Sequence, residues 1–488
     1  MADCCSQIDI RIGWAEVDIT PSVPCLVAGQ FYTRLSEQVL DPVTATALVL
    51  DSGGEQAVLV SCDLGAVPDG FRDAIRALLR TGAEGLDPIK VLFNATHTHT
   101  GPDIHRDYAV GTTTSVQGVE LEAMDHVGFQ AFAAPRIAEA VKKAWASRAP
   151  GGLAFGLGYA VVGRNRRWVD TNGTSCMYGQ TNAPLFSHIE GYEDHSLGLL
   201  ATVDAAGKLT GLVVNVPCPS QTSENEFVLS ADYWCETRAE LRARFGKDLF
   251  ILPQCSAAGD QSPHLLYDAQ AVGRMLGLKG RTVRQEIAQR ITSGVEDVLP
   301  FVMATADHSP KLVHRVEKVD LPMSALTQAD VDAALAEAEE LRVQYEAEMQ
   351  KLKADPSIKE KDPRWYKSPT YYHRRMRWQQ AVATRFQKQK TQSTMPVEFH
   401  VLRLGDLALA TSPFEYYLDF GVFIKARSPA VQTLLVQLTG SGSYCPSRRS
   451  LPGGGYGSVP ASNPVGPEGG RKLAERTVEV LLSLWPSA

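Results

Sequence analysis

Two histidines that stand two residues apart carry the strongest chemical signal in this sequence. His97 and His99 follow the apolar, β-branched run 89–93, which has the length and composition of a buried strand. In extended backbone, the side chains of residues i and i+2 point to the same face, so the two imidazoles are predicted to face a single site. Gly101 and Pro102 then end the strand. Such a pair suits a metal site or a proton-transfer site; a pair of structural histidines is the alternative.

Polar side chains also stand where four other predicted strands end. α/β proteins place their sites at such strand ends, although a carboxylate there also serves commonly as a turn or helix cap. The four positions are Asp63, Ser262, Glu415 and Tyr444. Since they lie far apart in the chain, only the fold can bring them to the histidines.

The composition excludes several classes of protein. The chain has 488 residues, 44% of them hydrophobic, so it can bury one large core or two moderate ones. Charged residues make up 21% and the net charge is -7, which favours neither nucleic-acid binding nor an anionic membrane surface. No apolar run reaches the roughly 18 residues of a membrane span. Neither a secretory signal nor C-x-x-C spacing is visible, so we expect a cytoplasmic protein. Its expected partner is a small-molecule substrate.

Strands and helices are predicted to alternate along the chain, which indicates an α/β fold. Hairpins are expected over 43–61 and 196–216, each around a turn-forming segment. Amphipathic helices are expected at 71–80 and over 269–293. We therefore predict one large domain over residues 1–488.

A helical insertion is predicted at about 325–392. Thr327 and Asp330 form an N-cap signature, and apolar residues then recur at helical spacing. The segment is expected to pack on the main body as an arm. Its apolar stripe suggests a contact between two copies of the chain, and the acidic whole argues against nucleic acid as its partner.

Taken together, these stretches resemble the neutral and alkaline ceramidases and their bacterial relatives. Residues 96–102, T-H-T-H-T-G-P, are very close to the family signature H-T-H-S-G-P, and residues 259–263, G-D-Q-S-P, are similar to its G-D-x-S-P. Residues 13–21 look like the family's N-terminal strand. Residues 413–415, P-F-E, sit where the family has P-G-E, and Tyr444 sits where it has its last tyrosine motif. The order agrees over nearly the whole chain apart from the insertion. The resemblance implies a mixed-sheet α/β catalytic domain.

The resemblance also implies a metal site. His97, Glu415 and Tyr444 would hold one divalent ion, with Zn²⁺ as the first choice and Mn²⁺ or Mg²⁺ as alternatives. Imidazole, carboxylate and phenolate suit Zn²⁺, and an open position would activate a water molecule with a pKa of roughly 7. The implied reaction is hydrolysis of an amide or ester bond.

Four more residues receive roles from the resemblance. His99 would lie beside the metal as proton donor or acceptor and would protonate the departing amine. Ser262 would be a catalytic or substrate-positioning hydroxyl, and Arg166 would face the substrate. Asp63 would accept a hydrogen bond that fixes a histidine tautomer, with a turn or helix cap as the alternative role.

The sequence departs from the family pattern at the second zinc histidine. Pro219 falls closest to that position, and its side chain cannot bind a metal. Three replacements stay open: Gln221 or Glu224, a displaced His99, or the acidic-histidine cluster within 188–195. We favour the last two. A harder oxygen donor would favour Mn²⁺ or Mg²⁺.

The loops near the predicted site are polar, which favours a small polar substrate over a lipid with two alkyl chains. Two other functions stay open. One is lyase, isomerase or glycoside-directed chemistry on a sugar-like substrate with the same metal. The other is a catalytically inactive binding protein, in which the missing histidine has abolished metal binding.

Overall fold

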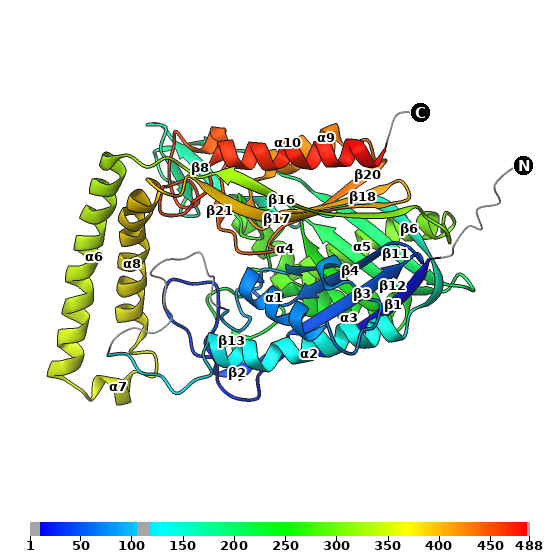
Figure 1. Cartoon of the computed structure of the whole chain (residues 1–488). Coiled ribbons are helices and arrows are strands. Elements are labelled where there is room, and N and C mark those ends of the chain that lie inside the picture. Colours follow the sequence, from blue (N-terminus) through cyan, green and yellow to red (C-terminus); the bar gives the residue numbers. More distant parts are fainter. Residues whose placement is uncertain (1–9, 105–117, 486–488) are drawn as a thin grey trace, which may run out of the picture.

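Two β-sheets face each other between layers of helices in the computed structural model, which describes residues 10–104 and 118–485 (Figure 1). The larger sheet has, in spatial order, the strands β14 (Phe250–Cys255), β12 (Leu209–Val216), β11 (Ser196–Asp204), β6 (Ala149–Tyr159), β1 (Arg11–Asp18), β3 (Thr44–Asp51), β4 (Gln56–Cys62) and β5 (Val91–Ala95). The second sheet contains β16 (Leu312–Pro322), β17 (Thr394–Leu404), β18 (Leu407–Thr411) and β20 (Gln432–Val436). The predicted α/β class with a mixed sheet is confirmed.

Both predicted hairpins are present. β3 pairs antiparallel with β4, and β11 pairs antiparallel with β12. The parallel pairs β4–β5, β12–β14 and β18–β20 are nearly continuous buried apolar runs, as expected for strands covered on both faces. Because β4 and β5 are parallel, the loops that follow them leave the same edge of the sheet.

Leucines fill the space between the two sheets. Leu48, Leu59 and Leu200 of the larger sheet pack with Leu402 and Leu434 of the second, all of them buried. The outer face of the larger sheet is covered by α1 (Asp69–Leu78), α2 (His126–Ala146), α3 (Tyr233–Phe245) and α5 (Val283–Met303). α9 (Leu418–Arg427) and α10 (Pro467–Leu484) cover the second sheet.

Short strands and turns carry the remaining connections. They are β2 (Gln38–Val39) with β13 (Val228–Leu229), β7 (Arg164–Asn165) with β15 (Gln261–Ser262), β19 (Glu415–Tyr416) with β21 (Tyr444–Cys445), the three strands β8 (Arg167–Asp170), β9 (Ser175–Met177) and β10 (Phe186–Ile189), and the 3-10 turns η1 (Pro88–Lys90) and η2 (Arg448–Ser450).

The single helix predicted over 269–293 is wrong. α4 (Ala269–Lys279) ends at Gly280, whose φ of 61° lies in the left-handed region, and α5 begins after Thr282. Thr282 and Gln285 form a capping box, which sequence periodicity alone did not separate from the helix interior.

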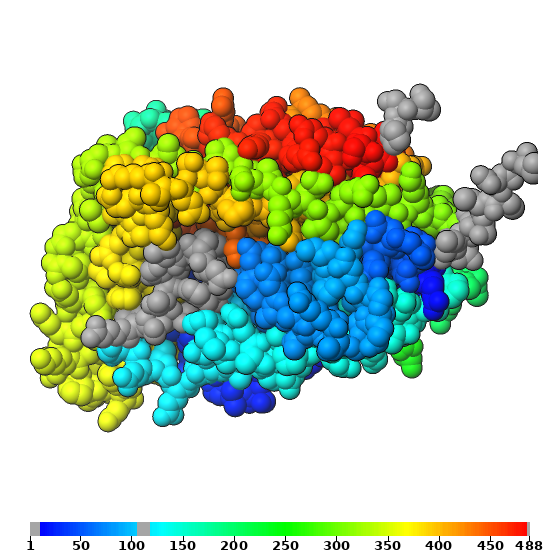
Figure 2. All heavy atoms as spheres, viewed as in Figure 1, coloured from blue at the N-terminus to red at the C-terminus, as the bar shows by residue number. Residues whose placement is uncertain are grey.

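The helical arm lies where it was predicted. It consists of α6 (Gln328–Ala354), α7 (Ile358–Lys361) and α8 (Lys367–Lys388), and the N-cap signature of Thr327 with Asp330 is a capping box. Figure 1 shows α6 and α8 side by side at one end of the molecule, and Figure 2 shows their surface there in yellow tones. The division of the chain into domains stays a prediction. Within 10–104 and 118–485, no helix is both long and apolar enough to cross a membrane.

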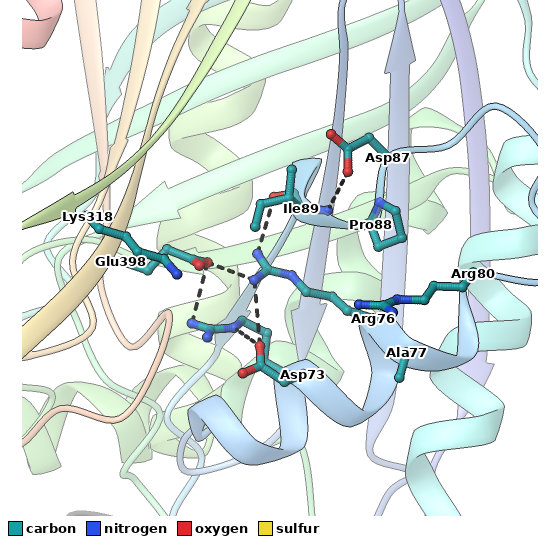
Figure 3. Close-up of a pocket in the computed structure, with 10 residues that line it drawn as sticks. Asp73, Arg76, Ala77, Arg80, Asp87, Pro88, Ile89, Lys318 and Glu398 are labelled. Atoms are coloured by element: carbon teal, nitrogen blue, oxygen red, sulfur yellow. Dashed lines mark hydrogen bonds and ion pairs between the residues drawn. The ribbon is translucent and has the colours of Figure 1, made fainter.

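A buried ionic contact joins α1 to the second sheet, beside a pocket of about 410 Å³ (Figure 3). Glu398 of β17 accepts a hydrogen bond from Arg76 of α1 at 2.8 Å, lies 3.5 Å from Arg72, and is 3.2 Å from the imidazole of His400. Burial acts to raise the pKa of Glu398, but the hydrogen bond with His400 and the two guanidinium groups lower it to about 2. The contact therefore fixes α1, which directly follows the loop after β4, against the second sheet.

Candidate active site

His97 lies two residues beyond β5, in a left-handed backbone conformation with φ of 61°. The strand ends at Ala95, so the extended backbone predicted through the histidine pair is wrong. The two rings nevertheless converge: the centroids of His97 and His99 are 4.9 Å apart and their planes are nearly perpendicular. A positive φ at a residue other than glycine is uncommon and is frequently found at functional sites.

The loop after β4 orients the His97 ring and sets which nitrogen faces the backbone. Its Nδ1 lies 2.5 Å from the carbonyl oxygen of Gly65, which can only accept, so Nδ1 carries the hydrogen. In a neutral ring Nε2 then holds a lone pair, and it lies 3.3 Å from Oε2 of Glu415. Two acceptors at this distance need a cation or a proton between them, so the pair fits a bound divalent ion.

Glu415 and Tyr444 are neighbours in a parallel pair of short strands, β19 and β21. Both side chains are buried. The Tyr444 hydroxyl accepts a hydrogen bond from Nη2 of Arg166 at 3.1 Å, and that guanidinium also lies 3.8 Å from Glu415. Burial raises the pKa of Tyr444 well above its usual value, and the positive charge of Arg166 opposes this shift.

Arg166 connects Tyr444 to Ser262. It is 2% exposed, and it donates to the Tyr178 hydroxyl and to the carbonyl of Gly259, each at 2.8 Å. The Tyr178 hydroxyl in turn lies 3.4 Å from Oγ of Ser262, which is fully buried in β15. The structure thus brings the predicted arginine and serine into one hydrogen-bonded chain with the tyrosine.

His99 lies between an amide and a carboxylate. Nε2 of His99 accepts a hydrogen bond from the Gln221 amide at 2.8 Å, and its Nδ1 is 3.2 Å from Oε2 of Glu224. The other oxygen of Glu224 is 3.0 Å from His264. Burial lowers the pKa of His99 to about 4, and the field of Glu224 opposes that shift only in part. His99 is therefore neutral near pH 7.

Asp63 does not hold a histidine, contrary to the sequence-based prediction. Its carboxylate is fully buried and accepts two hydrogen bonds from Arg238, at 2.8 and 3.0 Å, and further bonds from Thr44. The histidine tautomer is fixed instead by the backbone of Gly65, two residues later. Asp63 therefore supports the loop rather than the imidazole itself.

In the acidic-histidine cluster within 188–195, two of the carboxylates are engaged by cations. Glu190 pairs with Arg167 at 2.6 Å, and Asp194 pairs with Lys425 at 2.8 Å. His188 is exposed. Nε2 of His99 accepts a hydrogen bond from Gln221 here, and a displaced His99 stays a predicted replacement. Of the predicted replacements, Gln221 and Glu224 lie beside the histidine pair.

The sequence predicts one imidazole, one carboxylate and one phenol as donors for a metal, from His97, Glu415 and Tyr444. In the described part of the chain, no three residues drawn from histidine, cysteine, aspartate and glutamate are grouped as a metal site. The predicted set contains only two such residues, and its third member is Tyr444. The donors fit a divalent ion that accepts nitrogen and oxygen ligands, and they leave the choice among Zn²⁺, Mn²⁺ and Mg²⁺ open.

An apolar cavity adjoins this group of residues. It measures about 380 Å³, within the range of small-molecule pockets, and Thr222, Pro263 and His264 form its wall next to Gln221 and Ser262. Most of the opposite wall consists of aliphatic side chains of α4 and α5, namely Val272, Leu276, Val283 and Ile287. Arg164, Glu286 and Arg290 add charged groups to the lining. The polar loops near the site favoured a small polar substrate, and that stays a prediction beside this largely apolar cavity.

No protein-family model matches the chain. The crystal structure of neutral ceramidase from Pseudomonas aeruginosa superposes on 98% of this chain and 74% of its own, with a TM-score of 0.66 and 17% identity. A structure of ceramidase complexed with C2 gives a TM-score of 0.64 at 15% identity, over 98% of this chain and 75% of that one. The fold is that of neutral ceramidase.

The sequence of the Pseudomonas aeruginosa neutral ceramidase is 28% identical to this chain over 233 residues. This alignment covers 45% of the chain and 31% of the relative. The resemblance to neutral ceramidase noted from the motifs is thereby confirmed.

The motifs of the neutral ceramidase fold did not reveal every residue that shapes this site. Gly65 acts through its backbone, and Tyr178 lies outside each motif; neither gave a sequence signal. Arg34 was also missed: its guanidinium is buried and donates to the backbone carbonyls of Ala28 and His99. Such backbone-directed roles depend on tertiary contacts that a single sequence does not display.

Proposed function

We propose that this protein is a metal-dependent hydrolase that cleaves the amide bond of a small acyl amide. The observation that carries the proposal is the 3.3 Å approach of Nε2 of His97 to Glu415, with Nδ1 tied to Gly65. The likeness in fold and sequence to neutral ceramidase supports amide hydrolysis.

His97, Glu415 and Tyr444 would hold the ion. When bound, a divalent cation polarises a carbonyl oxygen and lowers the pKa of a water molecule to roughly 7. Arg166 keeps a fixed positive charge beside Tyr444 and Tyr178, where it stabilises negative charge that develops on the substrate oxygen. Ser262, 3.4 Å from the Tyr178 hydroxyl, can position that oxygen by a further hydrogen bond.

His99 is placed to move the proton. It is neutral near pH 7, with its lone pair at Nε2 and its hydrogen at Nδ1 beside Glu224. Nε2 can take the proton of the attacking water and return it to the departing amine, while Glu224 stabilises the imidazolium in between. The same atom thus serves as acceptor first and as donor second.

The apolar cavity beyond Pro263 and His264 suits the acyl part of the substrate. Aliphatic side chains of α4 and α5 form much of its wall, and they offer an acyl chain a place away from water, while Arg164, Glu286 and Arg290 add charge to the lining. The substrate is then an amide with an apolar acyl group, and its scissile carbonyl lies near Ser262.

The test compares His97→Ala with His188→Ala, a control at an exposed histidine outside the site. Elemental analysis of the purified proteins should find about one metal ion per chain in the wild type and in His188→Ala, and none in His97→Ala. Hydrolysis of medium-chain acyl amides should follow the metal content. Equal metal and equal hydrolysis in all three proteins would refute the proposal, and metal without hydrolysis would favour a binding protein.

A further inference from the structure

Helix α8 of the arm connects the two loops that support opposite sides of the candidate site. The first loop contains Thr33 and Leu35, whose backbone amides donate to Thr370 at 3.0 Å and to Tyr366 at 3.3 Å, both on the arm. That loop supports His99: an added Cβ at Gly29 would lie 2.6 Å from its Cβ. The arm thus fixes the loop that lies against one histidine.

The second loop lies on the tyrosine side of the site. Tyr456 contacts Tyr444, with ring centroids 5.2 Å apart, and also contacts Trp378 of α8 at 5.9 Å. Trp378 reaches the first loop as well, because its ring is 5.4 Å from that of Phe31. Near the C-terminal end of α8, Arg385 donates to the carbonyls of Pro460 and Asn463. One face of α8 therefore spans the space between the two loops.

Arg374 lies on that same face. It stands one helical turn after Thr370 and one turn before Trp378, and residues four apart share a helix face. Burial lowers the pKa of Arg374, and the field of Asp103 opposes this shift. The positive charge of Arg374 also contributes to lowering the pKa of Arg34, the arginine that binds the backbone of His99. Arg374 therefore lies on the face of α8 that spans the two loops, close enough to Arg34 and Asp103 to interact with their charges.

Arg374 forms neither a hydrogen bond nor a salt bridge with any residue in 10–104 or 118–485. Its neighbour Arg375, by contrast, pairs with Glu337 at 2.8 Å. A half-buried guanidinium without such a partner favours a ligand that supplies an anionic oxygen.

We infer that Arg374 is a specificity-determining residue that binds an anionic group on the amine portion of the substrate. The inference rests on the proposed amide hydrolysis. The three parts of the substrate then bind in three places. The acyl chain enters the cavity of α4 and α5, the carbonyl lies near Ser262, and the amine portion extends towards α8. The substrate class is an acyl amide of an amine that carries a carboxylate or a similar anion.

The test uses two amides of equal length: the octanoyl amide of γ-aminobutyrate, which carries a carboxylate, and the octanoyl amide of butylamine, which does not. The wild type should prefer the first in kcat/KM. Arg374→Met keeps the length of the side chain and its helix propensity, and it should lose about 10- to 100-fold in kcat/KM on the carboxylate substrate alone, mainly through KM. Arg377→Ala, an exposed arginine on the same helix, should behave like the wild type.

Two results would overturn the inference: a wild type that does not distinguish the two amides, or an Arg374→Met variant that keeps the preference. If the wild type hydrolyses neither amide, the proposed function fails, and calorimetric binding of the carboxylate amide then decides on Arg374 alone. Tighter binding by the wild type and Arg377→Ala than by Arg374→Met would uphold the anion site, and equal binding by all three would reject it.

Discussion

Gly259 offers a sharp test of how the candidate site is positioned, because it touches the backbone of a predicted metal ligand. A Cβ added at this residue would lie 2.8 Å from the carbonyl carbon of Glu415, and closer still to its oxygen. An ordinary contact begins at 3.4 Å, so Gly259→Ala must shift one backbone by at least about 0.6 Å, the difference of the two distances. Neither backbone can rotate away as a side chain can.

The expected result has two parts. Stability should fall by about 1–3 kcal/mol, the usual cost of an overpacked core. Amide hydrolysis should fall by about 10- to 100-fold, since a displacement of about 1 Å at a catalytic group costs about 10²-fold. Metal content should decrease as well, because the shift moves Glu415 relative to His97, whose Nε2 now lies 3.3 Å from its carboxylate.

Gly277→Ala is the matched control. Gly277 lies in α4, outside the lining of the cavity, with no atom within 4 Å of its added Cβ, so the same substitution there should stabilise the helix by about 0.5–1 kcal/mol and leave metal content unchanged. Thermal unfolding, elemental analysis and hydrolysis are measured on both variants. Normal metal content and activity in Gly259→Ala would refute the argument that this close approach positions Glu415.

Three further predictions concern metal binding, a buried ion pair and pH. Tyr444→Phe keeps the ring and removes the hydroxyl that Arg166 binds, so calorimetric titration should show metal affinity reduced at least about tenfold; an unchanged Kd would remove the tyrosine from the site. Arg238→Leu leaves Asp63 buried and unpaired, and denaturant unfolding should show a loss of about 3–5 kcal/mol; a loss below about 1 kcal/mol would contradict this. Glu398 has a pKa lowered from 4.5 to about 2, so its ionised form stabilises the fold above about pH 5, and this contribution disappears as the pH falls towards 2. The stability difference between wild type and Glu398→Gln, about 3 kcal/mol at pH 7, should therefore vanish near pH 2, and a pH-independent difference would contradict the shift.

The sequence predicted those secondary-structure elements whose residue pattern depends only on neighbouring positions in the chain. Alternating apolar residues gave the hairpins β3–β4 and β11–β12, and Thr327 with Asp330 gave the start of the arm. The break between α4 and α5 was missed, because Gly280 is compatible with a helix interior as well as with a left-handed end.

The candidate site could be predicted where its residues act through reactive or polar side chains. His97, Glu415, Tyr444, Arg166 and Ser262 are brought together by direct contacts or through the Tyr178 hydroxyl. What could not be predicted is the set of backbone partners and the charge pairing, which depend on which strand ends meet.

Asp63 shows why charge pairing escapes prediction. A carboxylate at the end of β4 is within reach of the loop after β5, so a histidine partner was reasonable from sequence. The structure instead supplies Arg238, an arginine of α3 that arrives from 175 positions further along the chain. The guanidinium pairs bidentately with the carboxylate and leaves the imidazole of His97 to the carbonyl of Gly65. The charge of Asp63 is thus balanced by Arg238 of α3, and the backbone carbonyl of Gly65, two residues later, is left to orient the His97 ring.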